Sequence, residues 1–153
     1  MQVKKLCGCP VKLLHRGMTT GICPTVNIIV NSGCGIHVYY LLDRPIEMYA
    51  TYLDALNKMK RGLTKLVWFV SKFGAEKVQV QSVVHSFRML GIKTKFGKPI
   101  RAFWNRSVPM HTPDEVNGFF GKAFGLTAEE LVMLNDRTPH NPANVTLKEA
   151  QEC

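Results

Sequence analysis

The sequence predicts an α/β (α+β) fold in which a mainly antiparallel sheet carries a long packed helix and is followed by a small helical tail. Three patterns predict it. Two β-rich apolar runs, 26–30 and 36–42, flank a short glycine-containing turn. Apolar residues then recur at helical spacing from Ile46 to about Lys72. Threonine-to-glutamate capping boxes mark helix starts in the last third of the chain.

Composition indicates an ordinary globular chain. Hydrophobic residues make up 46% of the 153 residues and charged residues 20%, which suits one domain or one domain with a small appendage. No apolar run approaches the ~18–20 residues of a membrane span, and the basic amino terminus lacks the apolar stretch of a signal peptide. Five irregularly spaced cysteines argue against a disulfide framework. We therefore expect a reduced, cytoplasmic chain with no membrane partner.

The first 24 residues are rich in glycine and proline, which interrupt both helices and strands. Gly8, Pro10 and Gly17 break the apolar pattern, so we expect 1–24 to be poorly structured. Residues 25–107 are expected to form the core and 108–153 the helical tail.

The turn between the two strands, residues 31–35, is the first candidate site. Its glycines allow close approach to the backbone, and its amides could form an anion-binding nest beside the Ser32 hydroxyl. Strand alternation places His37 on the same side as Tyr39 and opposite to its two neighbours. The alternative is a plain hairpin turn beside a packed histidine.

A helix is predicted from Ile46 to about Lys72. Gly62 weakens its middle, so one bent helix and two consecutive helices are both consistent with the pattern. A short strand at 78–81 and a β-hairpin formed by 92–95 and 100–104 follow. Three capping boxes, at Thr112/Glu115, Thr127/Glu130 and Thr146/Glu149, then begin the helices of the tail.

Positive charge is concentrated in the centre of the chain. Of the net charge of +9, residues 58–106 contribute twelve Lys and Arg against one acid, Glu76, as is typical of a polyanion-binding surface. A solvated basic face without a partner is the alternative. Aromatic residues interleave with these charges in 87–104, which suits either base stacking or an amphipathic hairpin over a core. The candidate nucleic-acid contacts are Lys58, Arg61, Lys65, Lys93, Lys95 and Arg101.

Residues 24–42 resemble the second motif of the archaeo-eukaryotic primase superfamily. That motif is an apolar strand, Ser-Gly-x-Gly-x-His, and a strand rich in aromatic residues. The resemblance implies that Ser32, Gly33, Gly35 and His37 bind the phosphates of an incoming nucleotide.

Residues 81–91 are similar to the third motif of the same superfamily, with Arg88 and Gly91 at its Arg-x-x-Gly positions. The resemblance implies catalytic roles for His37 and Arg88, and Mg²⁺ or Mn²⁺ as cofactor. The metal-binding acids of the family lie in a first motif upstream, yet residues 1–36 contain no Asp or Glu. We therefore assign no metal ligand here and expect a chain that begins after those acids, as a fragment, a split gene product or half of a two-chain enzyme.

The resemblance as a whole implies part of a DNA primase-polymerase, a nucleotidyltransferase inactive by itself. It would bind a nucleoside triphosphate and DNA during replication of a plasmid, phage or other mobile genetic element. Its missing acids would come from an upstream polypeptide segment. The alternatives are a non-catalytic DNA-binding part of a plasmid replication initiator, or a decayed gene product.

The cysteines and the remaining histidines are weaker candidates for chemistry. Cys7 and Cys9, with Cys23 and Cys34, lack the spacing of a zinc knuckle, so we expect free cysteines. His85 and His111 are expected to be surface or packing residues.

Overall fold

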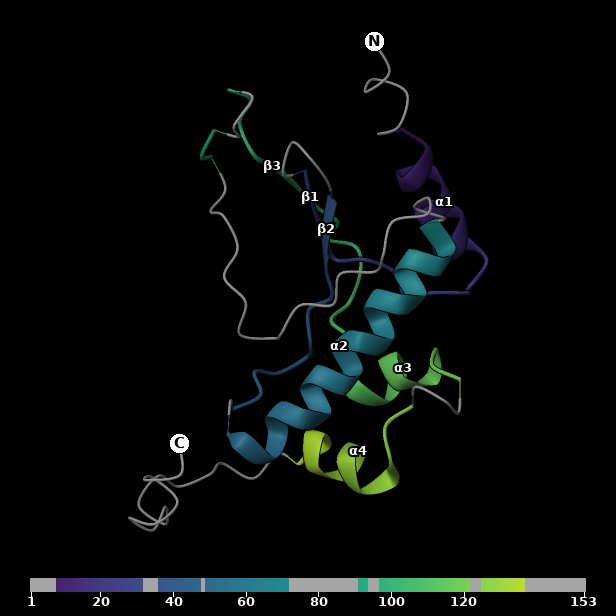
Figure 1. Ribbon diagram of the computed structural model, residues 1–153, viewed down its shortest axis with the longest axis vertical. Coiled ribbons are helices and arrows are strands. Elements are labelled where there is room, and N and C mark those ends of the chain that lie inside the picture. The colour runs from purple at the N-terminus through teal and green to yellow at the C-terminus, as the bar shows by residue number, and fades with distance from the viewer. Residues whose placement is uncertain are drawn as a thin grey trace.

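The fold is mixed α/β. The computed structural model describes residues 8–31, 36–47, 49–71, 91–93, 97–121 and 125–136. These form a small three-stranded antiparallel sheet, with β1 (Ile28–Asn31), β2 (Ile36–Tyr39) and β3 (Arg101–Trp104) in the order β2-β1-β3, and four helices. The helices are α1 (Gly8–Thr19), α2 (Ala50–Ser71), α3 (Pro113–Gly118) and α4 (Ala128–Asn135). Figure 1 shows α1 beside one end of α2, and α3 and α4 beside its other end. No helix in these ranges is long and apolar enough to cross a membrane.

The sheet is built from the two predicted apolar runs and the second arm of the predicted hairpin. β1 (Ile28–Asn31) lies between β2 (Ile36–Tyr39) and β3 (Arg101–Trp104), and both pairings are antiparallel. Ile28 pairs with Tyr39 on one side and with Trp104 on the other. The predicted pair of antiparallel strands at 26–30 and 36–42 is therefore confirmed.

One face of the sheet packs against α1 and α2. Ile29 of β1 and Val38 of β2 contact the hydrophobic cluster that these helices form. Because side chains alternate along a strand, His37, Tyr39 and Trp104 lie on the opposite face. The sheet therefore separates a face packed on helices from a face that carries a histidine and two aromatic residues.

α2 (Ala50–Ser71) is one continuous helix, which decides between the two alternatives left open by Gly62. Gly62 is buried because the ring of Phe120 lies against it. A Cβ atom added there would lie 2.9 Å from Cζ of Phe120. The glycine therefore admits an aromatic ring from the region after α3 and does not break the helix.

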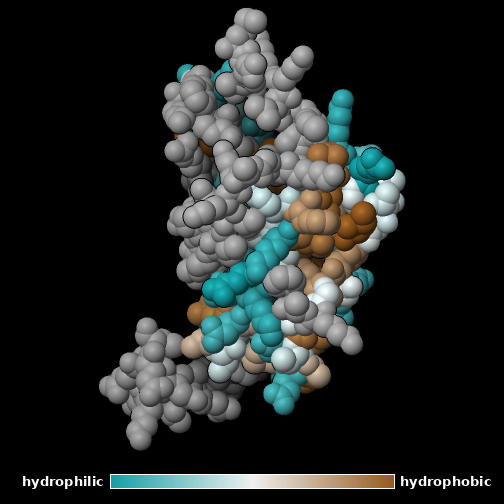
Figure 2. Space-filling view, turned by 45° about the vertical axis from the view of Figure 1, so that its right-hand side comes forward, coloured by the Kyte–Doolittle hydropathy of each residue, from teal (hydrophilic) through white to brown (hydrophobic). Residues whose placement is uncertain are grey.

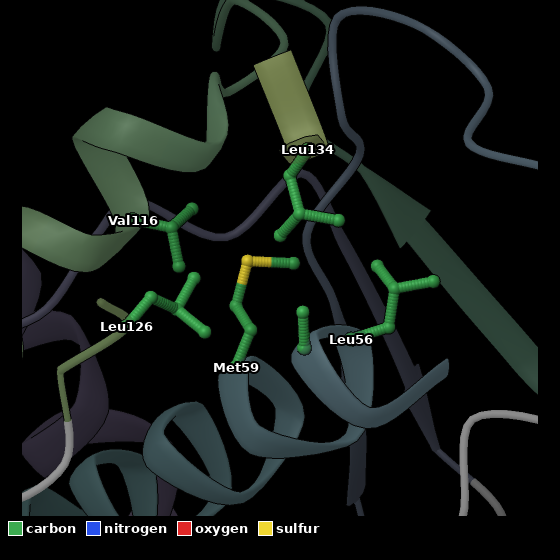
Figure 3. Close-up of a cluster of buried hydrophobic side chains, with 6 residues drawn as sticks. Leu56, Met59, Val116, Leu126 and Leu134 are labelled. Atoms are coloured by element: carbon green, nitrogen blue, oxygen red, sulfur yellow. The ribbon is translucent and has the colours of Figure 1, made fainter. Parts of the chain in front are cut away.

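α2 contributes to two hydrophobic clusters. Near its start, Leu56 and Met59 pack with residues of α3 (Pro113–Gly118) and α4 (Ala128–Asn135) and of the segment between them (Figure 3). Near its end, Leu66, Val67 and Val70 pack with the sheet and with α1 (Gly8–Thr19). The predicted tail thus shares a hydrophobic core with α2.

The tail helices begin and end with specific caps. The capping boxes at Thr112/Glu115 and Thr127/Glu130 are both formed, as predicted, and Thr146 and Glu149 lie outside the described residues. At the other end of α4, the Arg44 guanidinium donates to the carbonyls of Leu134 and Asp136. Cationic groups stabilise helix carboxyl ends, where carbonyls lack helical partners.

The expectation that residues 1–24 lack regular structure is wrong for Gly8–Thr19, which form α1. Pro10 lies in the first helical turn, where its missing amide removes no helical hydrogen bond. Gly17 lies at the contact with α2, where a Cβ atom would lie 2.2 Å from Cγ1 of Val70 and 3.2 Å from Sγ of Cys23. Residues that look like helix breakers therefore act as a helix start and a close packing point.

The predicted hairpin is present in its described part. Lys93 pairs with Pro99 in antiparallel orientation, and the Ile100 amide donates to the Ile92 carbonyl at 3.0 Å. Gly97, in the connecting loop, has a φ of +73°, a conformation that favours glycine. Beyond Ile100 the chain continues as β3. The predicted strand at 78–81 lies outside the described residues.

We predict that Gly17→Ala destabilises the protein by about 1–3 kcal/mol, because the added methyl group overpacks the contact between α1 and α2. Gly118→Ala is the matched control, since no atom lies within 4 Å of a Cβ there, and it should be neutral or slightly stabilising. Urea denaturation measures both.

The double variant Gly17→Ala, Val70→Ala tests the cause. Removing Cγ1 of Val70 relieves the overlap, so the two substitutions should destabilise less together than the sum of their separate effects. Additive losses would show that Gly17 is needed for another reason.

Candidate nucleic-acid interface

The predicted nucleotide site is described only in part. His37 lies in β2, half-buried, on the face opposite to α1 and α2 and on the same side as Tyr39, as alternation predicted. Asn31 pairs with Ile36. Ser32, Gly33, Gly35 and Arg88 lie outside the described residues. Their convergence with His37 remains a prediction.

The residues around His37 show whether this face could bind the Mg²⁺ or Mn²⁺ that the resemblance implies. Its cross-strand row consists of Val30 and Ala102, and the next row consists of Tyr39, Ile28 and Trp104. Mg²⁺ and Mn²⁺ require hard oxygen ligands, above all carboxylates, and neither row contains one. The described residues of this face therefore do not fit a divalent metal, and we derive no step through one.

The basic residues predicted on α2 lie on the side away from the sheet. Lys58 forms an ion pair with Glu130 of α4, with 2.9 Å between Nζ and Oε2. The hydrogen bond from Lys58, together with that from the Thr127 amide, lowers the pKa of Glu130. Arg61 and Lys65 are exposed, on the helix face opposite to the residues that contact the sheet.

The remaining predicted basic residues belong to the hairpin and β3. Lys93 and Arg101 are exposed, whereas Lys95 lies outside the described residues. Arg101 pairs with Asn31 and therefore projects on the side of the sheet opposite to Trp104. The central basic block does not form one surface in the part of the chain that is described. On the face turned to the viewer in Figure 2, hydrophilic residues lie beside apolar ones.

At one end, the sheet face with His37 carries a pair of an aromatic and a cationic residue, of which the sequence pattern indicated only the aromatic one. Trp104 was among the candidate stacking residues, and the Arg106 guanidinium carbon lies 5.3 Å from its ring centroid. Beside them is an open pocket of about 350 Å³, lined by Asn27, Leu41, Trp104, Arg106, Val108 and Met110. Locally, the sequence indicates the pair only by placing Arg106 two positions after Trp104, the last residue of the predicted strand 100–104.

Asn27 holds the wall of this pocket in place. Its side chain is 1% exposed and uses both polar atoms. Nδ2 donates to the carbonyls of Pro109 (3.1 Å) and Val108 (3.4 Å), and Oδ1 accepts from the Leu41 amide (2.8 Å). In the sequence, this hydrogen-bond network is indicated only by a polar residue, Asn27, inside the apolar run 26–30. The hydrogen-bond partners of Asn27 are distant in sequence, so the pattern does not identify them.

His111 is a packing residue, which decides between the surface and packing roles expected for it. It is buried, and its Nε2 donates to the Thr25 carbonyl at 2.8 Å. Its amide donates to the Leu41 carbonyl (2.8 Å), and its own carbonyl accepts from the Asp43 amide (2.9 Å). The segment after β3 is thereby tied to the segments that flank β1 and β2.

The described ranges contain no metal-binding group, and their buried cysteine is unpaired. Cys23 is a free, buried cysteine, as expected, and burial raises the pKa of its thiol. Cys7 and Cys34 lie outside these ranges. No group of three His, Cys, Asp or Glu residues within them could hold a metal ion.

The hydroxyl group of Tyr40 is also buried in this region. Its ring lies edge-on to His111, with centroids 5.9 Å apart. Among the described residues, none forms a hydrogen bond with its buried hydroxyl. Burial, and secondarily the nearby Cys23, raise the pKa of Tyr40 above its usual range.

Comparison with known proteins adds no relative: no family model, curated protein or solved structure matches the chain.

We predict that Asn27→Ala destabilises the protein by about 2–4 kcal/mol, because it leaves the Leu41 amide and two carbonyls without their buried partner. Asn27→Asp should also destabilise, since an acceptor then faces the carbonyls of Val108 and Pro109. Urea denaturation measures the loss, and Asn105→Ala is the comparison at a less buried position. Equal stability of Asn27→Ala and the wild type would contradict the network.

We predict that Tyr40→Phe leaves stability at pH 7 unchanged or raises it by about 1 kcal/mol, because it removes a buried hydroxyl without a described partner. The wild type should also lose stability as pH rises above about 10, where tyrosine ionises in the unfolded chain but not at this site. Tyr40→Phe lacks this contribution. Denaturation at pH 7 and at alkaline pH gives both comparisons, and a clear loss at pH 7 would contradict the assignment.

Proposed function

We propose that this chain binds nucleic acid on the sheet face that carries His37, Tyr39 and Trp104. We further propose that it belongs to a replication protein of the primase-polymerase kind, with nucleotide phosphates at residues 32–37 and the DNA strand passing toward Trp104 and Arg106. The observation that carries the proposal is the shared face. A histidine that follows a Ser-Gly-x-Gly sequence lies on the same side of the sheet as an exposed tryptophan paired with an arginine.

The distances within the sheet suit this assignment. His37 and Trp104 are two strands apart and two residues apart along the strands, which corresponds to ~12 Å. A nucleotide bound beside His37 and a neighbouring base beside Trp104 could therefore belong to one bound strand. The side chains between them, Val30 and Ala102 in one row and Ile28 and Tyr39 in the other, carry no charge that would repel phosphate.

The charge around the interface also supports nucleic acid as the partner. Residues 77–113 contain no Asp or Glu. Arg106 lies at the end of the shared face, and Lys93 and Lys98 are exposed on the adjoining hairpin. Cations without acids among their sequence neighbours raise the local potential and attract a polyanion.

The second candidate is a non-catalytic DNA-binding part of a replication initiator. The same exposed cations and the Trp104–Arg106 pair favour it, because binding a strand there requires neither a metal ion nor a reacting group. A primer-synthesis assay separates the two candidates when the chain is tested alone and together with any upstream polypeptide that carries the metal-binding acids.

We predict salt-dependent binding of a single-stranded oligonucleotide and no primer extension by this chain alone, with either Mg²⁺ or Mn²⁺. Affinity measured by fluorescence anisotropy should fall as salt rises from about 50 to about 200 mM, with a slope near 0.7 per neutralised phosphate. Arg106→Glu should weaken binding more than Arg101→Glu, which changes the opposite side of the same sheet edge.

Lys12→Glu is the matched control, because it makes the same change of charge at an exposed position of α1. If Arg106, Arg101 and Lys12 variants weaken binding equally, only net charge matters and the interface is elsewhere. Salt-independent binding, or none, would contradict the proposed function.

A further inference from the structure

We propose that the pocket beside Trp104 is a base-stacking subsite, which takes one unpaired base of a single strand while Arg106 contacts an adjacent phosphate. This inference rests on the proposed function and names the form of nucleic acid that the interface selects. It assigns a specific task to residues that no resemblance marks as functional.

Trp104 presents the stacking surface. It ends β3 and is 53% exposed, although its cross-strand neighbour Ile28 belongs to the central strand. An indole ring partly open to solvent and bordering a pocket offers a flat apolar surface of the size of a base. Bases within a duplex already stack on one another, so only an unpaired base can use this surface.

Arg106 supplies the charge next to the ring. Its guanidinium stacks over Trp104 at 5.3 Å, and a stacked guanidinium keeps its N–H groups at the edge for hydrogen bonds. Planar N–H donors suit the oxygens of a phosphate group. The pair therefore combines a base contact and a phosphate contact within one nucleotide, while the exposed Lys93 and Lys98 are further cations on the hairpin at the opposite end of β3.

The rest of the pocket predicts little base specificity. Its other walls are the apolar side chains of Leu41, Val108 and Met110, which form no hydrogen bonds. Asn27 also lines it, but both of its side-chain polar atoms are engaged by Leu41, Val108 and Pro109. Few groups remain to read the edge of a base, so we expect stacking without strong sequence preference.

Intrinsic fluorescence provides the direct test. The chain has two tryptophans, so Trp68→Phe leaves Trp104 as the single reporter. Titration with an oligo(dT) of about 12 nucleotides, within the usual length of a single-strand site, should quench this fluorescence. An oligo(dA) of equal length should quench similarly, whereas a duplex of equal length should bind more weakly and quench little.

The matching affinity test uses Trp104→Ala. Its affinity for oligo(dT) should fall roughly 5- to 100-fold, while its weaker affinity for the duplex changes little. Trp104→Phe should retain much of the single-strand preference because it keeps an aromatic face. Phe69→Ala is the control, since Phe69 is an aromatic residue on α2 that is 76% exposed, and its removal should leave affinity unchanged.

The outcomes separate this inference from the proposed function. If Trp104→Ala keeps wild-type affinity for oligo(dT) and binding remains salt-dependent, the stacking subsite is wrong and the proposed function stands. If the wild type binds no nucleic acid, both are wrong. If Trp104→Ala only lowers stability in urea, Trp104 is a structural residue. Should that variant fail to fold, quenching in the Trp68→Phe protein and the affinity of Trp104→Phe decide the question.

Discussion

The structure depends on the burial of one apolar stripe along the whole of α2. Its 22 residues span ~33 Å, and the stripe contacts α3 and α4 near its start and α1 and the sheet near its end. A helix of this length gains most of its stability from packing, not from intrinsic propensity. Both hydrophobic clusters therefore require α2, and the positions of the sheet and of the tail helices follow from it.

Two glycines allow neighbouring elements to approach α2 closely. Gly17 brings α1 against Val70, and Gly62 accepts the ring of Phe120. Side chains at these positions would separate the elements by the width of a methyl group, which well-packed cores do not absorb without strain. Phe120 belongs to one hydrophobic cluster and Val70 to the other, so each contact aligns a different cluster with the same helix.

A second constraint is polar, and it shapes the candidate interface. Asn27 and His111 are buried and hydrogen-bonded to backbone groups that are distant in sequence. A buried polar group is tolerated only where its partners are in place, so these bonds determine where residues 105–111 run. That path places Arg106, Val108 and Met110 around Trp104. The interface consequently needs few residues with a direct binding role, because the buried bonds position them.

Local patterns in the sequence were sufficient for the three strands of the described sheet, the long helix and two capping boxes, because each depends on residues two to four positions apart. Strand alternation likewise placed His37 and Tyr39 on one side of the sheet.

The charge pattern was less informative, since it treats neighbours in sequence as neighbours in space. Lys58 forms an ion pair with Glu130 because α4 lies beside α2. Arg101 projects away from Trp104 because of its register with Asn31 of β1. α1 was not predicted because Gly17 looks like a helix breaker in the sequence. Its role as a close packing point depends on its contact with Val70, which is 53 positions away. The pocket at Trp104 also required the tertiary structure, because Asn27 forms it through bonds to residues more than 80 positions along the chain.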